Sequence, residues 1–218
     1  LDQCASSNWN SIDPMIFGAL IESCFTDRER AVGGIHFTRE EDIQRIVRPM
    51  IIEPLLEERH RIDLMPEAHH VQRRGRLQTL LQRIHNLSIL EPACGCGNFL
   101  YVAYRELKRL ENSVLQRMRS LPNMELYEPM YLLSPRNFTG IEIQNWSAWV
   151  ARLVMELAFC RTQIELRRAP IPLTNRENSA RIHCQDALLD GNTARMWPEA
   201  TVIIGNPPFL GHNRMREA

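Results

Sequence analysis

The stretch Leu87–Leu100, Leu-Ser-Ile-Leu-Glu-Pro-Ala-Cys-Gly-Cys-Gly-Asn-Phe-Leu, decides the fold of this chain. A short apolar run ends in the carboxylate of Glu91, a proline and two glycines follow, and an apolar segment with helical spacing begins at once. This order predicts a strand, a tight loop and a helix, which can hold a nucleotide-like ligand at the carboxyl end of a parallel strand. Gly95 and Gly97 have no side chain to obstruct a close approach between backbone and ligand. Because a Gly-x-Gly pair alone is common, the interpretation depends on the rest of the chain.

A second stretch, Val202–Phe209, also runs from an apolar strand into a loop, with the sequence Val-Ile-Ile-Gly-Asn-Pro-Pro-Phe. Two further strands are expected at 138–143 and 181–185, and a long helix is expected from 146 to 160. Strands that alternate with helical segments predict an α/β fold with a mainly parallel sheet.

The first part of the chain is expected to be helical, and we divide the sequence into a helical segment at 1–86 and a core at 87–218. Helices are predicted at 16–25, from Thr38 onward, and at 77–84. Thr38 and Glu41 have the spacing of a capping box, and Pro54 is expected to end the second helix. Stretches without a clear period are interpreted as a surface connection at 57–75 and an irregular insertion at 112–137.

Composition describes a soluble globular chain of 218 residues, with 44% hydrophobic and 24% charged residues. The formal net charge is zero, so no global basic field indicates a nucleic-acid partner. Six cysteines show neither zinc-site spacing nor a disulfide framework, which favours reduced thiols in a cytoplasmic protein and no metal site. No apolar run reaches membrane-spanning length, and no signal peptide is evident at the start.

Taken together and in this order, the two stretches resemble the class I S-adenosylmethionine-dependent methyltransferases of the N6-adenine DNA type. The likeness runs from about Phe17 to Gly211 and is greatest to the large MmeI-like restriction–modification enzymes. It implies a Rossmann-like methyltransferase fold, S-adenosylmethionine as cofactor, and double-stranded DNA with a flipped target adenine as partner. A Gly-x-His-Phe-Thr element at 34–38 comes first, and the order of motifs resembles the gamma class.

The resemblance implies a role for each motif in binding the cofactor. The loop after the first strand would wrap the methionine part, Glu142 would accept hydrogen bonds from the ribose diol, and Asp186 would accept one from the adenine amine. Cys96 departs from the family pattern, where Ser or Thr is more usual, and a thiol is a weaker donor. The cofactor-binding residues expected on this basis are His36, Phe37, Thr38, Glu91, Pro92, Ala93, Cys94, Gly95, Gly97, Asn98, Phe99, Glu142, Ile143, Asp186, Ala187 and Leu188.

The catalytic residues expected are Asn206, Pro207, Pro208 and Phe209. An adenine amino nitrogen is a poor nucleophile because its lone pair is delocalised into the ring. The Asn206 side-chain oxygen and the Pro207 carbonyl would accept hydrogen bonds from its two N–H groups and so free that lone pair. Phe209 would stack on a base extruded from the duplex.

Three alternatives follow from the same residues. A nicotinamide dehydrogenase would need a third glycine where Leu100 stands, and it would leave Asn-Pro-Pro-Phe unexplained. Protein-glutamine methyltransferases share Asn-Pro-Pro, but typically with Tyr after it. Finally, the four expected strands are fewer than the family's full sheet, so the chain could be an N-terminal fragment that binds cofactor but cannot methylate. Little or no turnover is predicted for these 218 residues alone. The other strands and a recognition domain would then lie beyond Ala218, and the fourth strand would be an uncovered edge.

Overall fold

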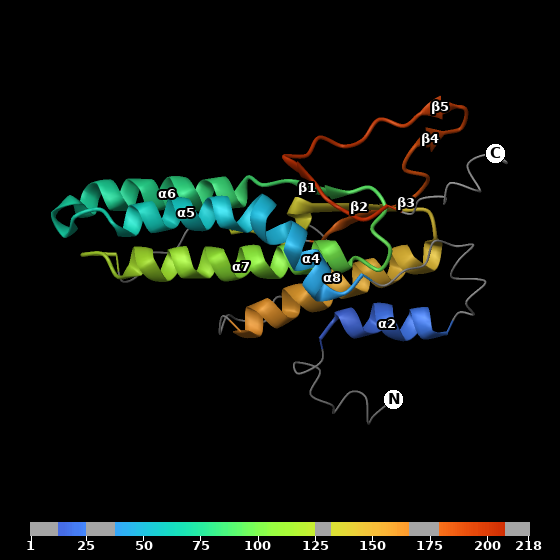
Figure 1. Ribbon diagram of the computed structural model, residues 1–218, viewed down its shortest axis with the longest axis horizontal. Coiled ribbons are helices and arrows are strands. Elements are labelled where there is room, and N and C mark those ends of the chain that lie inside the picture. The colour runs from blue at the N-terminus through green and yellow to red at the C-terminus, as the bar shows by residue number, and fades with distance from the viewer. Residues whose placement is uncertain (1–12, 25–37, 125–131, 166–178, 208–218) are drawn as a thin grey trace, which may run out of the picture.

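A computed structural model describes residues 13–24, 38–124, 132–165 and 179–207 (Figure 1). Four parallel strands form its main sheet in the order β3-β2-β1-β6. Their bounds are Ile89–Glu91 for β1, Phe138–Glu142 for β2, Arg181–Cys184 for β3 and Val202–Ile203 for β6. The structure therefore confirms the α/β class, the parallel sheet and all four expected strands.

The strand order places β1 at the point where the chain changes direction across the sheet. From β1 the chain moves outward to β2 and β3, and it then returns to the other side of β1 as β6. Ile89 pairs in register with Phe138 of β2 and with Val202 of β6. Since parallel strands end at one edge of the sheet, the loops after all four strands lie along the same edge, where α/β proteins bind ligands.

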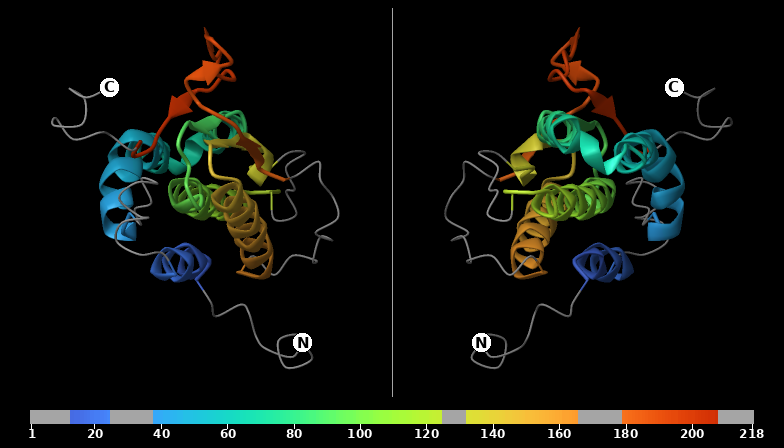
Figure 2. Two further views of the ribbon diagram at one scale, coloured as in Figure 1. Left: turned by 90° about the vertical axis from the view of Figure 1, so that its right-hand side faces the viewer. Right: turned by 90° about the vertical axis from the view of Figure 1, so that its left-hand side faces the viewer.

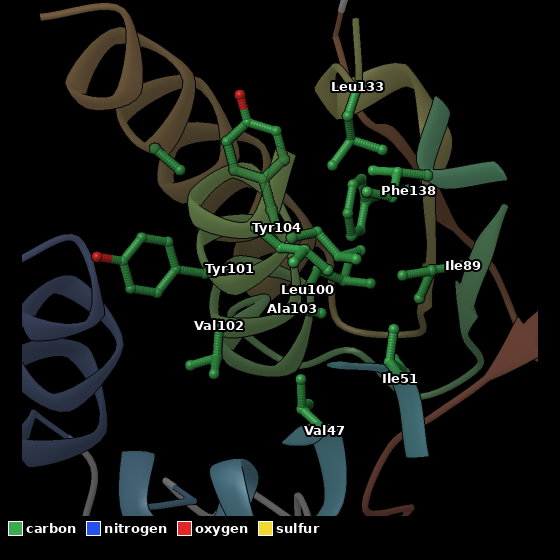
Figure 3. Packing of buried hydrophobic residues seen from close by; sticks show 14 of the residues in the cluster. Val47, Ile51, Ile89, Leu100, Tyr101, Val102, Ala103, Tyr104, Leu133 and Phe138 are labelled. Atoms are coloured by element: carbon green, nitrogen blue, oxygen red, sulfur yellow. The ribbon is translucent and has the colours of Figure 1, made fainter. Parts of the chain in front are cut away.

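Two long helices, α7 (Asn98–Arg119) and α8 (Asn145–Glu165), pack on each other and against the strands. The first turns of α7 are buried on every side because α4, α6, α8 and the sheet surround them. In the core, the rings of Tyr104 and Phe138 meet edge to face, with centroids 5.5 Å apart. Figure 3 shows Leu100, Ile89 and Leu133 packed around them.

The helices before β1 pack around α7 and α8, with α4 and α6 against α7 and α2 against both. They are α2 (Met15–Ser23), α4 (Glu40–Val47), the π-helical segment η2 (Arg48–Ile52), α5 (Glu53–Asp63), the short 3-10 helix η3 (Glu67–His69) and α6 (His70–His85). Figure 2 shows α2 beside α8, at the opposite side of the molecule from the β4–β5 hairpin. That hairpin pairs Leu189–Asp190 with Thr193–Ala194.

The structure corrects several expectations about the first half of the chain. Pro54 does not end a helix, because residues 40–63 stay helical from α4 through the π-helical segment η2 into α5. The stretch 57–75 is therefore mostly helical rather than a connection. Thr38 makes no capping box: α4 begins at Glu40, its N-cap is Arg39, and no side chain caps it.

Two differences concern the second half. Helix α7 continues to Arg119, so the expected irregular insertion from 112 begins about two turns late. The β4–β5 hairpin was not expected, because each strand has only two residues and its turn, Gly191-Asn192, is the main signal. Among the described residues, no helix is long and apolar enough to cross a membrane, and no group of His, Cys, Asp and Glu could hold a metal ion.

Candidate cofactor site

The loop between β1 and α7, residues 92–97, turns tightly at the carboxyl edge of the sheet. The Cys94 amide donates to the Ile141 carbonyl of β2 at 2.9 Å, and the Gly97 amide donates to the Cys94 carbonyl at 2.7 Å. Gly95 and Gly97 have φ angles of +52° and +83°, which side chains disfavour. No atom lies within 4 Å of a Cβ built on Gly95, whereas a Cβ on Gly97 would lie 3.1 Å from that of Ala151 in α8. The loop is therefore open at Gly95 and tightly backed at Gly97.

Glu142, at the end of β2, fixes this loop from the neighbouring strand. Its Oε2 accepts a hydrogen bond from the Gly95 amide at 2.8 Å, and its Oε1 accepts one from the Gln144 amide at 2.7 Å. A carboxylate has about four acceptor positions, so two remain for other donors such as hydroxyl groups. The bond between Glu142 and Gly95 was not expected from the sequence, because 47 positions separate the two residues.

Glu91, at the end of β1, is buried beneath the loop with 2% of its surface exposed. Its Oε2 has no hydrogen-bond partner among the described residues. Burial raises the pKa of Glu91 well above the usual carboxyl range, and the nearby charge of Glu142 raises it further, against the lowering effect of the Leu100 amide. A buried acceptor without a partner needs an explanation, and a ligand donor at this edge would supply one.

Asp186 follows β3 by two residues and lies at the same edge of the sheet. Its Oδ1 accepts hydrogen bonds from the Leu188 and Leu189 amides at 2.7 and 3.0 Å. These backbone donors lower the pKa of Asp186. Both bonds use Oδ1, which leaves Oδ2 to accept from another donor. The side chain of Leu188 is 70% exposed, so an apolar surface lies next to this carboxylate.

Asn206 and Pro207 follow β6 and are exposed. Gly205 brings this loop close to β1: a Cβ built on Gly205 would lie 3.2 Å from Cγ of Glu91. The loop of the expected catalytic residues and the loop of the expected cofactor residues therefore begin at neighbouring strand ends. Pro208 and Phe209 lie outside the described residues.

The remaining expected residues differ in what they offer a ligand. Cys94 and Phe99 are buried in the core, which leaves their backbone rather than their side chains for contact. Ile143 is 62% exposed beside Glu142, and Pro92, Ala93 and Ala187 are half-buried.

Thr38 is half-buried just before α4, whereas His36 and Phe37 lie outside the described residues. Cys94 has a raised pKa because it is buried, so it is no candidate nucleophile.

These residues fit a nucleotide-type cofactor. Two carboxylates end adjacent strands, a third follows the next strand, the glycine loop is open at Gly95, and the buried Glu91 oxygen lacks a partner. A parallel sheet in the order β3-β2-β1-β6 with this loop after β1 is a Rossmann-like fold.

Comparison with known proteins shows the family. The family model of the MmeI DNA-methyltransferase domain matches residues 67–218 of the sequence, and the chain belongs to that family. DNA methyltransferase A of Bacillus subtilis (strain 168) is 30% identical over 220 residues, which cover 96% of this chain and 24% of that protein. The solved structure of the type IIL restriction–modification enzyme MmeI in complex with DNA is also similar, with a TM-score of 0.72 and 26% identity over 84% of this chain and 24% of that one. The chain thus spans about a quarter of the length of these relatives.

Proposed function

We propose that this chain is the catalytic part of a DNA methyltransferase that transfers a methyl group from S-adenosylmethionine to the N6 amino group of adenine. The observation that carries the proposal is the pair of loops at neighbouring strand ends: the glycine loop held by Glu142, and the Asn206 loop brought against Glu91 by Gly205. Membership of the MmeI family and the likeness to an enzyme solved with DNA support double-stranded DNA as partner and a restriction–modification context.

The cofactor would be held by the groups that remain free at this edge. Glu142 keeps acceptor positions for the ribose hydroxyls, and Asp186 keeps Oδ2 for the adenine amine. The exposed side chains of Ile143 and Leu188 would pack against an adenine ring. When bound, S-adenosylmethionine supplies an electrophilic methyl group and a positive charge. Glu91 is a buried carboxyl group at this edge, and a cation bound beside it would favour its ionised form.

Asn206 and Pro207 would activate the target base. Both residues are exposed after β6, and the Asn206 side-chain oxygen and the Pro207 carbonyl can accept hydrogen bonds from the two N–H groups of an amino group. Proline fixes φ and has no N–H, so the loop presents its carbonyl without rearrangement. Phe209 would stack on the flipped adenine. Attack on the methyl group would then depend on positioning rather than on a covalent intermediate.

The product of the reaction tests this proposal. The chain would be incubated with methyl-labelled S-adenosylmethionine and genomic DNA that lacks methylated adenine, and the digested nucleosides would be analysed by mass spectrometry. Any label transferred to DNA is expected in N6-methyladenine, strongly reduced for Asn206→Ala and unchanged for Asn192→Ala, an exposed asparagine in the β4–β5 turn. Label in methylcytosine, or in protein glutamine, would contradict the assigned substrate. Cofactor binding without any transfer to DNA would favour a cofactor-binding module instead.

A further inference from the structure

Helix α2 touches the glycine loop, although it belongs neither to the sheet nor to α7 or α8. A Cβ built on Gly18 of α2 would lie 3.2 Å from Cβ of Cys96 and 3.5 Å from Oδ1 of Asn98. Gly18 is buried, so the bare backbone of α2 lies directly on the loop where it enters α7. About 80 positions separate the two segments in the sequence, and their contact arises only from the fold.

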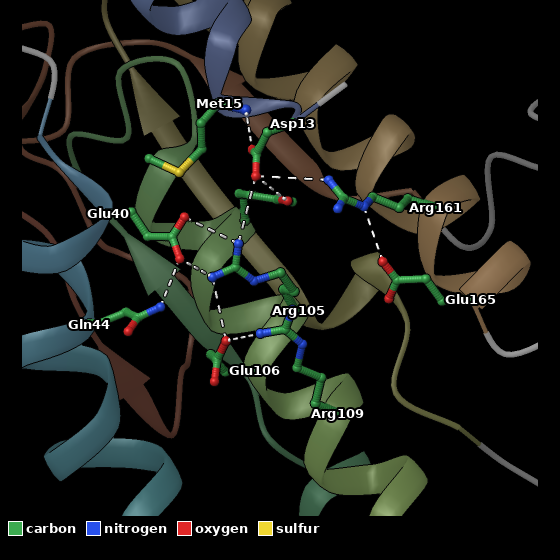
Figure 4. A network of polar contacts seen from close by, with 10 residues as sticks. Asp13, Met15, Glu40, Gln44, Arg105, Glu106, Arg109, Arg161 and Glu165 are labelled. Carbon is green, nitrogen blue, oxygen red and sulfur yellow. Dashed lines mark hydrogen bonds and ion pairs between the residues drawn. The ribbon is translucent and has the colours of Figure 1, made fainter. Parts of the chain in front are cut away.

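The position of α2 is fixed at its start by Asp13. Oδ1 of Asp13 accepts from the Met15 amide at 2.9 Å and caps the helix. Oδ2 accepts from the Tyr101 hydroxyl at 3.4 Å and lies 3.9 and 3.8 Å from guanidinium nitrogens of Arg105 and Arg161. Asp13 therefore ties α2 to both α7 and α8, as Figure 4 shows.

Arg105, one of the two cationic partners of Asp13, is itself held in place. Arg105 is buried, donates to Glu40 of α4, and lies over the ring of Tyr101 at 5.3 Å from its centroid. Its bond to Glu40 lowers the pKa of that carboxyl group. Because Arg105 joins α2 and α4 to the same turn of α7, the helices before β1 are attached to the core close to the glycine loop.

The loop is consequently held between two helices at positions without bulky side chains. Ala151 of α8 lies against Gly97 on one side, and Gly18 of α2 lies against Cys96 and Asn98 on the other. Asn98 is 8% exposed, and its Oδ1 has no hydrogen-bond partner among the described residues.

We infer that Gly18 is a positioning residue for the cofactor: α2, anchored at Asp13, presses on Cys96 and Asn98 and sets the conformation of the glycine loop. This inference rests on the proposed function for its ligand, S-adenosylmethionine, but the contact with the loop stands without it. The absence of a side chain at Gly18 would then be required for loop geometry. Helix propensity predicts the opposite preference, because Ala favours a helix interior over Gly.

Gly75 provides a matched control. It lies inside helix α6, it is exposed, and a Cβ built there meets no atom within 4 Å. Gly75→Ala therefore makes the same chemical change in a helix without a loop contact. Gly18→Leu and Gly75→Leu enlarge the effect, while Asp13→Ala releases α2 without adding an atom to the contact.

The experiment measures hydrogen–deuterium exchange of peptides covering residues 92–99 without cofactor, and S-adenosylmethionine affinity by calorimetry, with thermal melting to show that each variant is folded. Gly18→Ala is expected to speed exchange in the loop and to weaken binding about tenfold, with a larger effect for Gly18→Leu. Asp13→Ala is expected to speed exchange in both the loop and α2, and the Gly75 variants to change neither quantity.

A folded Gly18→Leu variant with wild-type loop exchange and wild-type affinity would overturn the inference. If Gly18→Leu does not fold, Gly18→Ala and Asp13→Ala decide in the same way. If the wild-type chain binds no S-adenosylmethionine, the proposed function fails, and loop exchange alone still decides whether α2 sets the loop conformation.

Discussion

The loop after β1 and the loop after β6 leave the same edge of the sheet but are supported in different ways. The glycine loop is enclosed by Glu142, α2 and α8, and the core lies directly beneath it. Asn206 and Pro207 are exposed, and the neighbouring Ile203 is 55% exposed on an edge strand. The first loop therefore has its geometry set by packing inside the chain, whereas the second offers polar groups with little support from the described residues. A site for a small cofactor needs a loop whose geometry is fixed by packing, whereas a surface that receives a large substrate can use exposed polar groups.

The largest expected effect separates the two loops by function. Asn206→Ala should reduce the rate of adenine methylation by about 100- to 1,000-fold, the loss typical when one donor or acceptor at a reacting group is removed. Since Asn206 is exposed, the variant should keep wild-type stability and S-adenosylmethionine affinity. Rate, melting temperature and calorimetric affinity would be measured together. A variant that transfers methyl groups at the wild-type rate would remove Asn206 from the mechanism.

A second change tests whether packing fixes the glycine loop. Gly140→Ala in β2 places a Cβ 2.7 Å from Sγ of Cys94 and 2.9 Å from Cδ1 of Ile182. Overpacking of this kind costs about 1–3 kcal/mol of unfolding free energy, which urea denaturation can measure. Adding Cys94→Ala removes the sulfur and should recover part of the loss in a double-mutant cycle. Equal stability of Gly140→Ala and wild type would show that the loop region is less tightly packed than described.

The smallest effect concerns Glu91, which lies beneath both loops. The pKa of this carboxyl is raised in the folded chain, so the folded state binds the proton more tightly than the unfolded state does. Stability should therefore fall as pH rises from the unfolded value near 4.3 toward the folded pKa, and then level off. Glu91→Gln cannot ionise and should melt at a higher temperature than wild type at neutral pH, with the difference shrinking toward pH 4. Glu67→Gln, exposed on η3, controls for the loss of one charge. A melting difference that does not change with pH would contradict a raised pKa of the buried Glu91 carboxyl group.

The sequence alone predicted the parts of the fold that depend on local pattern. The apolar run before Glu91 and the glycines after it gave β1, its loop and the start of α7 correctly. Pro54 was a less reliable signal, because the helical run continues from α4 through the π-helical segment into α5 and does not end at this proline. The expected capping box at Thr38 did not form, because the N-cap of α4 is Arg39, one residue after Thr38. The first turn then contains Glu40, Glu41 and Asp42, whose negative charges favour a helix N-terminus.

What the sequence could not predict are contacts between distant segments. Glu142 was expected from its place at a strand end, but its bond to the Gly95 amide depends on the pairing of β1 with β2. Gly18 and Arg105 had no local motif, and their roles follow only from the packing of α2 and α4 on α7. The assignment of Asn206, Asp186 and the other site residues to roles in catalysis and binding stays a prediction.

The measurement that tests the central claim most directly is calorimetric titration of the chain with S-adenosylmethionine, beside Asp186→Asn and Asp42→Asn. Asp186→Asn keeps an oxygen for the Leu188 and Leu189 amides but replaces the free Oδ2 with a donor. Asp42 is an exposed residue of α4 and controls for the charge. We expect saturable binding to wild type and Asp42→Asn, and binding weaker by about tenfold for Asp186→Asn, the effect of one lost hydrogen bond to a charged group. A folded wild-type chain that binds no S-adenosylmethionine, or equal affinity for all three, would contradict the cofactor site described here.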